Sequence, residues 1–337
     1  MPDPIFEKKN VLVTGGAGFI GSHLCERLLR DGHRVICVDN FSTGHERNIE
    51  ALLSNPDFQF LRADVTQPLD LESFAELAAF KIPFQGVQEI YHLACPMSIA
   101  GFDQFRMQTL LANALGMYVP LEIARRYRAR VVFTSSSVVY GPRRADDPFV
   151  EETQFGAVDQ LSPRACYDEG KRFAETMCAT YRQVHRLDVR IARVFRTYGP
   201  RLPLFDGQLI PDFVLNAMEN KDLVIYGNGE LRTSLVYVDD VVDGLVRLMA
   251  APQAPDVVNF GHDAEVNISD VAREVIALVG SSSKIVAGAD LLFLSELPAP
   301  RIGRAKDLGW LPLVRLEDGL RKTVEYVREN KLLLTMG

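Results

Sequence analysis

The sequence lacks the features that define several classes of protein. It has no apolar run of membrane-spanning length, and its first ten residues are polar, without the hydrophobic core of a signal peptide. No run of Lys or Arg stands out among 37 basic and 44 acidic residues, and the formal net charge is -7. The composition therefore argues against a membrane protein and against a nucleic-acid-binding surface.

Cysteine and histidine are also sparse. The five cysteines are an odd number without paired spacing, and the six histidines are scattered, so the sequence predicts neither a disulfide framework nor a metal site. Free thiols are typical of a reducing compartment, and we expect a cytoplasmic protein. The 337 residues suffice for one large or two modest domains, and no repeat or low-complexity segment interrupts them.

A glycine-rich turn near the amino terminus is the first feature with a chemical meaning. Residues 10–14 read as a buried strand, and residues 22–30 have helical periodicity. Between them, Gly15 permits a tight turn, Gly18 lets the backbone approach a pyrophosphate, and Gly21 lets the helix pack on the strand. Strand, glycine turn and helix in this order predict a dinucleotide site, with an unliganded turn as the alternative.

The next strand indicates which dinucleotide is bound. Residues 34–38 read as a strand that ends in Asp39. An acid at this position binds the adenosine ribose hydroxyls and disfavours a 2′-phosphate. The sequence therefore predicts NAD rather than NADP as the cofactor.

Strand and helix patterns alternate along the rest of the first 194 residues, which predicts an α/β fold with a doubly wound parallel sheet of the Rossmann type. Ligands bind beyond the carboxyl ends of the strands in such sheets. The predicted strands cover residues 58–64, 89–94, 130–135 and 188–194, and the predicted helices cover 71–79, 104–128 and 167–185.

After Val194 the pattern changes, because proline and glycine become frequent. We expect a smaller carboxyl-terminal α/β lobe that binds the substrate, with returns to the main sheet at Ser234–Tyr237 and Val257–Phe260. The predicted NAD-binding domain is residues 1–194 plus about 232–262, and the predicted lobe is about 195–231 plus 263–337. Within this region we expect helices over 211–219, 268–279 and 316–330 and a strand over 223–226.

A Tyr and a Lys in the predicted helix 167–185 form a candidate catalytic pair. Tyr167 and Lys171 are four residues apart and so share one helix face. A Lys charge beside a phenol lowers a pKa that is normally about 10. Such a phenol can take a proton from an alcohol as a hydride leaves. By itself the spacing also occurs by chance, so its meaning depends on the glycine turn.

Taken together, these motifs resemble the extended short-chain dehydrogenase/reductase family, in the branch that remodels nucleotide-diphosphate sugars. The resemblance covers about Asn10 to Arg328, and within the branch it is strongest to the UDP-glucuronate decarboxylases. It rests, beyond the glycine turn, on Asp39–Gly44 (DNFSTG), Tyr91–Pro96 (YHLACP), Tyr167–Arg172 (YDEGKR) and Thr197–Arg201 (TYGPR).

The resemblance implies a mechanism for three residues. Tyr167 would deprotonate the sugar 4-hydroxyl while NAD takes hydride from C4, and Lys171 would hold the nicotinamide ribose. Ser136 would hydrogen-bond the reacting hydroxyl, although a cap at the end of a strand is its alternative role. NAD would be regenerated in each cycle, so no net oxidation results.

Further contacts are implied around both ligands. Asn113 would act through water, or it is an ordinary polar residue of its helix. The residues expected at NAD are Gly15, Gly18, Phe19, Ile20, Gly21, Asp39, Asn40, Ser42, Thr43, Gly44, Asp64, Val65, Leu93, Ala94, Asn113, Thr134, Ser135, Tyr167, Lys171 and Phe195. Those expected at a nucleotide-diphosphate sugar are Pro96, Ser137, Val138, Arg164, Arg196, Thr197, Arg201, Arg232 and Arg301.

The chain departs from the family pattern where the product is chosen. Val138 stands where decarboxylases of the branch carry a Glu, and where dehydratases need part of an acid pair. Arg196 replaces the usual Asn and is either a relocated anion clamp or the partner of a neighbouring acid. Thr233 replaces a phosphate-contacting Arg, and Ala299 and Arg301 alter a late substrate-binding segment.

Three functions remain open from the sequence. A non-acidic Val138 favours a nucleotide-sugar epimerase with a 4-keto intermediate. The overall likeness, with Arg164, favours a nucleotide-hexuronate decarboxylase. An NAD-binding regulator without catalysis is the third hypothesis, against which the intact Tyr and Lys argue. The resemblance also suggests a homodimer through helices 104–128 and 167–185, although their apolar stripes would equally serve packing within one chain.

Overall fold

The computed structural model describes residues 7–144, 146–204, 206–226, 231–288 and 296–335. Part of the amino-terminal segment that we expect to lack a signal peptide, residues 1–6, lies outside these ranges. None of the helices in the described ranges is both long and apolar enough to span a bilayer.

A seven-stranded, fully parallel sheet forms the centre of the molecule, in the order β12-β7-β5-β4-β1-β2-β3. The order reverses beside β1, as in a doubly wound sheet, which confirms the predicted fold class. The strands are β1 (Asn10–Thr14), β2 (Arg34–Asp39), β3 (Phe58–Arg62), β4 (Glu89–His92), β5 (Arg130–Ser136), β7 (Val189–Val194) and β12 (Val257–Phe260).

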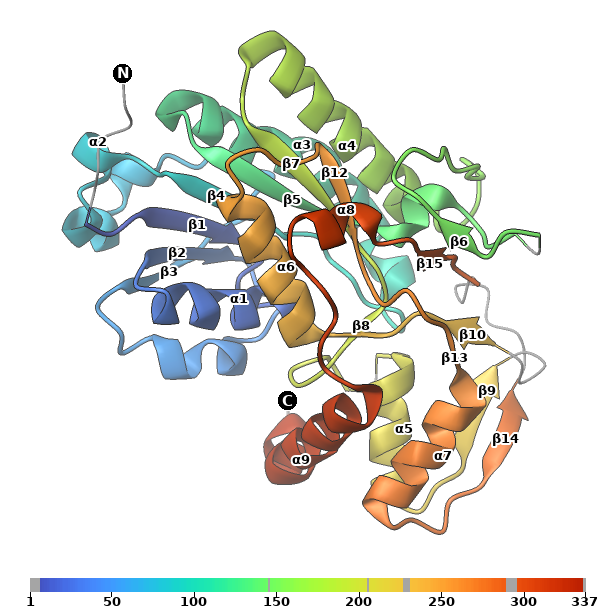
Figure 1. Ribbon diagram of the computed structural model, residues 1–337. Helices are drawn as coiled ribbons and strands as arrows, with labels where there is room; N and C mark the ends of the chain where they lie inside the picture. Colours follow the sequence, from blue (N-terminus) through green and yellow to red (C-terminus); the bar gives the residue numbers. More distant parts are fainter. Residues whose placement is uncertain (1–6, 145, 205, 227–230, 289–295, 336–337) are drawn as a thin grey trace.

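Helices cover both faces of this sheet. The helices α1 (Phe19–Arg30) and α6 (Val238–Ala250) pack on one face, and α3 (Phe102–Tyr127) and α4 (Ala165–His185) pack on the other, as Figure 1 shows. Because both faces are covered, the central strands are apolar on both sides, and all five residues of β1 are buried. A short helix, α2 (Ile82–Gln85), precedes β4.

The carboxyl-terminal lobe combines three helices with a small parallel sheet. The helices α5 (Leu209–Met218) and α7 (Ile268–Val279) pack on β9 (Leu223–Tyr226) and β14 (Ile285–Gly288), which pair with each other, and α9 (Leu316–Thr335) packs on α5 and α7. Local signals set the ends of α7, because Asn267 accepts a hydrogen bond from the Ser269 amide and Gly280 ends the helix at a φ of 73°.

Three pairs of two-residue strands connect the sheet to the lobe. They are β8 (Thr197–Tyr198) with β11 (Val236–Tyr237), β10 (Arg232–Thr233) with β13 (Val266–Asn267), and β6 (Phe149–Val150) with β15 (Ala299–Pro300). The short helix α8 (Gly303–Asp307) follows β15.

Two sequence-based assignments need correction. Val257–Phe260 joins the main sheet as predicted, but the predicted return at Ser234–Tyr237 is wrong, because β11 pairs with β8 outside the main sheet. The predicted helix 71–79 is instead two 3₁₀ segments, Leu71–Ser73 and Ala75–Phe80. The helix α6 was not predicted from the sequence.

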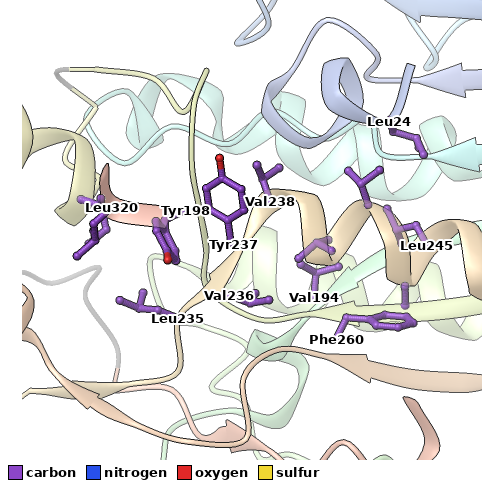
Figure 2. Close-up of a cluster of buried hydrophobic side chains, with 14 of the residues drawn as sticks. Leu24, Val194, Tyr198, Leu235, Val236, Tyr237, Val238, Leu245, Phe260 and Leu320 are labelled. Carbon is purple, nitrogen blue, oxygen red and sulfur yellow. The ribbon is translucent and has the colours of Figure 1, made fainter. Parts of the chain in front are cut away.

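One hydrophobic cluster runs from the sheet into the lobe without a break. Figure 2 shows Leu24 of α1 and Leu245 of α6 at one end of this cluster and Leu320 of α9 at the other. Tyr198 and Tyr237 lie between them, with ring centroids 5.6 Å apart in an edge-to-face arrangement. The lobe is therefore packed against the Rossmann layer rather than tethered to it by a linker.

Candidate active site

A cavity of about 530 Å³ lies at the carboxyl ends of the parallel strands. Residues at or just beyond the ends of β1, β2, β4, β5 and β7 line one side of it. The lobe lines the other side with Leu202, Pro203, Gly207, Gln208 and Leu209. This is the crevice at which open parallel sheets bind their ligands.

The glycine turn forms one end of the cavity and fits a dinucleotide. Gly15 has a φ of +74°, and a Cβ there would lie 2.7 Å from the Ala94 amide nitrogen. A Cβ on Gly21 would overlap the Gly15 carbonyl oxygen, so helix and strand approach closely only without side chains. No side chain caps α1 at Gly18, which leaves the first amides of the helix available to a phosphate.

The predicted ribose ligand Asp39 is held at the end of β2. Its carboxylate accepts hydrogen bonds from the Ala17 amide at 3.0 Å and the Phe41 amide at 2.8 Å. Burial raises the pKa of Asp39, and these backbone bonds oppose the rise. Nearby, Asn40 donates to Asp64 at 3.2 Å, which connects the ends of β2 and β3.

Nearly all the residues expected at NAD line this cavity. The exception is Asn113, which lies beneath it on α3 and donates to the Thr109 carbonyl at 2.9 Å and to Cys95 Sγ at 3.3 Å. The cavity-lining members of the set are Gly15, Gly18, Phe19, Ile20, Gly21, Asp39, Asn40, Ser42, Thr43, Gly44, Asp64, Val65, Leu93, Ala94, Thr134, Ser135, Tyr167, Lys171 and Phe195.

The three predicted catalytic residues meet at the middle of the cavity. Ser136 is the last residue of β5, and Tyr167 and Lys171 lie in the first two turns of α4. Lys171 Nζ donates to the Thr134 carbonyl at 3.0 Å and lies 5.9 Å from the centre of the Tyr167 ring. Ser136 accepts a long hydrogen bond from the Val138 amide at 3.4 Å, so it also caps the short 3₁₀ turn Ser137–Tyr140.

The phenol of Tyr167 is not activated by its protein surroundings alone. Burial raises the pKa of Tyr167, and the Cys95 thiol adds to the rise, while a hydrogen bond with Ser136 and the charge of Arg164 oppose it. Burial also lowers the pKa of Lys171. The expectation that Lys171 lowers the phenol pKa is therefore corrected: desolvation of the buried phenolate dominates.

A buried polar cluster holds the end of β5 in place. Glu175, one turn after Lys171, accepts a hydrogen bond from Ser135 at 2.6 Å. The guanidinium of Arg193 on β7 donates to both Glu175 oxygens, at 2.9 and 2.7 Å. This cluster fixes β5, β7 and α4 relative to one another directly behind Ser136.

The structure divides the predicted sugar-binding residues into two groups. Arg201, Arg232 and Arg301 do not line the cavity: Arg201 pairs with Glu26 at 2.5 Å, Arg232 is exposed, and Arg301 lies 3.5 Å from a Glu151 carboxylate oxygen. The residues of the set that do line it are Pro96, Ser137, Val138, Arg164, Arg196 and Thr197.

The sequence analysis missed much of the cavity wall. Most of its apolar part comes from two loops that carry no motif, one after β4 and one before α5, and Leu297 adds to it from a third segment. The two loops are joined where Ser98 and the Ile99 amide donate hydrogen bonds to the Asp206 carboxylate. Because the contact links residues over a hundred positions apart, no local signal announces it. The missed lining residues of this wall are Met97, Ile99, Phe102, Leu202, Pro203, Gly207, Gln208, Leu209 and Leu297.

Metal chemistry has no evident place in the described part of the chain, where no three His, Cys, Asp or Glu side chains gather as metal ligands would. The five cysteines are free thiols.

Comparison with known proteins agrees with this geometry. Residues 11–261 match the model of the NAD dependent epimerase/dehydratase family. The chain is 41% identical over 334 residues to UDP-glucuronic acid decarboxylase 1 of Xenopus tropicalis, covering 96% of this chain and 73% of that protein.

Solved structures of two epimerases are also similar. The Thermotoga maritima UDP-glucose 4-epimerase with UDP-glucose superposes with a TM-score of 0.82 at 28% identity, covering 96% of this chain and 99% of that one. The Bacillus cereus UDP-glucuronic acid 4-epimerase, in complex with UDP-glucuronic acid and NAD, gives 0.81 at 26% identity, covering 95% and 99%.

Proposed function

Because the chain belongs to the NAD dependent epimerase/dehydratase family, we propose that it is a nucleotide-sugar 4-epimerase that works through a transient keto sugar. The observation that carries the proposal is that Ser136, Tyr167 and Lys171 meet in one cavity beside the non-acidic Val138. Family membership confirms the predicted resemblance and the predicted cofactor, while the choice among reactions is our proposal.

The chain's own residues account for the proton transfers. Tyr167 would take the proton of the sugar 4-hydroxyl and return it to the keto oxygen, and Ser136 would hold that oxygen in line. Bound NAD would supply the hydride acceptor, and the positive charge of its nicotinamide, with Lys171, would oppose the raised pKa of the buried phenol. Rotation of the keto sugar before hydride returns would invert C4.

The acid groups of the cavity support epimerisation over dehydration. Among the described residues that line it, the carboxylates are Asp39 and Asp64, both at the end assigned to adenosine. Ser137 and Val138, which follow Ser136, provide no acid for the loss of water. A 4-epimerase needs no further acid, since only the hydride changes face.

Decarboxylation of a nucleotide hexuronate is the second candidate. The likeness to the Xenopus tropicalis decarboxylase favours it. Two arginines that line the cavity, Arg164 and Arg196, suit the carboxylate of a hexuronate, whether that carboxylate is lost or kept. A β-keto acid can lose carbon dioxide without a nearby carboxylic acid, so Val138 does not exclude this reaction.

Product analysis separates the candidates. Purified protein is incubated with UDP-glucuronate and, separately, UDP-glucose, followed by NMR of the products and trapping of carbon dioxide. A 4-epimer with retained carbon supports the proposal, whereas stoichiometric carbon dioxide and a pentose product would replace it with the decarboxylase. No turnover on a broad panel of nucleotide sugars, with NAD bound, would favour the regulator hypothesis.

We further propose a homodimer formed through α3 and α4. Both helices expose large apolar side chains, among them Met107, Leu115 and Tyr118 on α3 and Phe173 and Val184 on α4. Apolar side chains gathered on neighbouring helices are typical of an interface between subunits.

We also propose the roles given above for the site residues, the division into an NAD-binding domain and a sugar-binding lobe, and a cytoplasmic location.

A further inference from the structure

Arg196 lines the cavity as a cation that has no partner among the residues that the structure describes. It follows β7 at the sugar end, where its backbone carbonyl accepts a hydrogen bond from the Val236 amide at 3.0 Å. Its guanidinium forms no ion pair or hydrogen bond with the described residues, and Nη1 is enclosed without an acceptor. The alternative that Arg196 neutralises a neighbouring acid therefore finds no support within the described part of the chain.

The charge of another arginine acts on Arg196. Arg164 also lines the cavity, and its guanidinium lies 3.2 Å from an Asp168 oxygen. Burial and the charge of Arg164 lower the pKa of Arg196 to about 10, so it still carries its charge at neutral pH. An enclosed charge without a counterion is costly, and a second cation beside it raises that cost. Both effects favour an anion at this place.

The position of the pair indicates which part of the substrate carries the anion. Arg164 precedes Tyr167 by one helical turn, and its charge lowers the pKa of that phenol, so the two arginines lie on the side of the reacting C4. In a hexose ring C1, which carries the diphosphate, lies across the ring from C4, whereas C5 is adjacent to C4. A carboxylate on C5 would therefore reach the arginines more readily than the diphosphate.

We propose that Arg196 and Arg164 bind the sugar carboxylate of a nucleotide hexuronate. This inference rests on the proposed keto-sugar chemistry and specifies its substrate. Charge-assisted hydrogen bonds from a guanidinium to a carboxylate are strong and directional, so the site would select hexuronates over neutral hexoses.

The same contact would preserve the carboxylate during the keto stage. Loss of carbon dioxide breaks the C5–C6 bond, moves its electron pair into the enolate of the C4 ketone, and requires a proton at C5. Guanidinium groups bound to the carboxylate stabilise the negative charge there, before the C5–C6 bond breaks. In the transition state that charge moves towards the C4 oxygen, away from the guanidinium groups, so the step becomes slower. Val138 offers no proton for C5, so hydride return would win over decarboxylation.

The test compares Arg196→Met with the wild type on matched sugars. We expect the wild type to prefer UDP-glucuronate to UDP-glucose in kcat/KM, and the variant to lose about 30- to 100-fold of that preference, as for a lost charged hydrogen bond. Arg196→Lys should recover part of it, and the exposed Arg315→Met should keep all of it. Without ligand, Arg196→Met should melt no lower than the wild type, because it removes an unpaired charge.

Binding measurements distinguish the possible anions and do not depend on turnover. If Arg196 binds the sugar carboxylate, the variant weakens binding of UDP-glucuronate but not of UDP. Equal weakening of UDP, UDP-glucose and UDP-glucuronate would assign Arg196 to the diphosphate and overturn the inference. A comparison of glucuronate 1-phosphate with glucose 1-phosphate gives the same information without the nucleoside. If the wild type does not bind glucuronate 1-phosphate more tightly, the inference is overturned. If it does but turns over no nucleotide sugar, only the proposed reaction is overturned.

Discussion

At the scale of single residues, the protonation state of Tyr167 determines whether it can act as a base. Burial keeps Tyr167 neutral, and Lys171 donates to the Thr134 carbonyl rather than to the phenol. A neutral phenol is a poor base, and a positive charge beside it would favour the ionised form. We infer that a cationic cofactor beside Tyr167 would complete the base, which would couple proton removal to the presence of the hydride acceptor.

Tyr167→Phe tests the proton transfer. The variant keeps the ring but loses the proton acceptor, so we expect turnover to fall by about 100- to 10,000-fold while NAD stays bound. Turnover is followed by NMR of the nucleotide sugar, and NAD by its absorbance after denaturation. Tyr181→Phe on the same helix, which removes a phenol bonded to Glu122, is the control. Wild-type turnover in Tyr167→Phe would exclude the proposed base.

Val138→Glu tests the choice of product. Val138 packs with Phe102 and Tyr167 at the cavity wall, so an acid there would lie beside the reacting carbons. With UDP-glucuronate we expect the share of turnovers that release carbon dioxide to rise about tenfold or more, because a proton donor then exists for C5. Trapped carbon dioxide is the measurement. Val138→Thr, of equal shape without an acid, should leave the share unchanged; a rise in both variants would contradict the role of the acid.

At the scale of elements, the ends of parallel strands carry buried polar groups that only neighbouring strands can satisfy. His92, the last residue of β4, lies beside Thr14 of β1, with 2.7 Å between Nδ1 and Oγ1, and stacks on Phe133 of β5. Burial, with the charge of Lys171, lowers the pKa of His92 to about 3. The sheet therefore holds a neutral imidazole at every pH of practical interest.

This imidazole makes stability depend on pH. The pKa of His92 is lower in the folded than in the unfolded chain, so its contribution is complete above about pH 6.5 and is lost as pH falls towards 3. Between pH 7.5 and 5 we expect a loss of about 2 kcal/mol from this residue. Urea unfolding of His92→Asn should show a correspondingly flatter pH profile, while the exposed His185→Gln should follow the wild type. Parallel profiles in all three proteins would refute the assignment.

At the scale of the whole molecule, the Rossmann layer and the lobe share one core. The cluster in Figure 2 joins α1 and α6 to α9 through Tyr198 and Tyr237, and the two layers enclose the cavity between them. The opposite face of the sheet carries α3 and α4, whose outer sides remain apolar and exposed. The outer sides of α3 and α4 are therefore where we propose that a second copy binds.

Leu115→Glu tests the proposed homodimer. Leu115 is 50% exposed on α3, so a charge there should disturb the subunit interface without unfolding the chain. Light scattering should give twice 37.6 kDa for the wild type and 37.6 kDa for the variant. Phe84→Glu, which changes a side chain that is 91% exposed on α2, should remain dimeric. A wild type with a mass of 37.6 kDa at micromolar concentration would contradict the proposed homodimer.

The sequence by itself determined what depends on neighbouring residues along the chain. Alternating apolar segments gave the parallel sheet and most of its helices, and the glycine turn with Asp39 gave the dinucleotide. These predictions succeeded because turn geometry and strand or helix periodicity are local properties. Most of the residues that the resemblance assigned to ligands line the cavity, whereas Arg201 and Arg301 pair with acids of other segments and Arg232 is exposed.

Only the tertiary structure decided what depends on contacts between distant segments. The pairing of β11 with β8, the apolar wall joined through Asp206, and the raised pKa of Tyr167 all arise from residues far apart in the chain. That no acid of the described residues pairs with Arg196 is likewise a property of the tertiary structure. Electrostatics and cavity shape are sums over a three-dimensional environment, so no short stretch of sequence contains them.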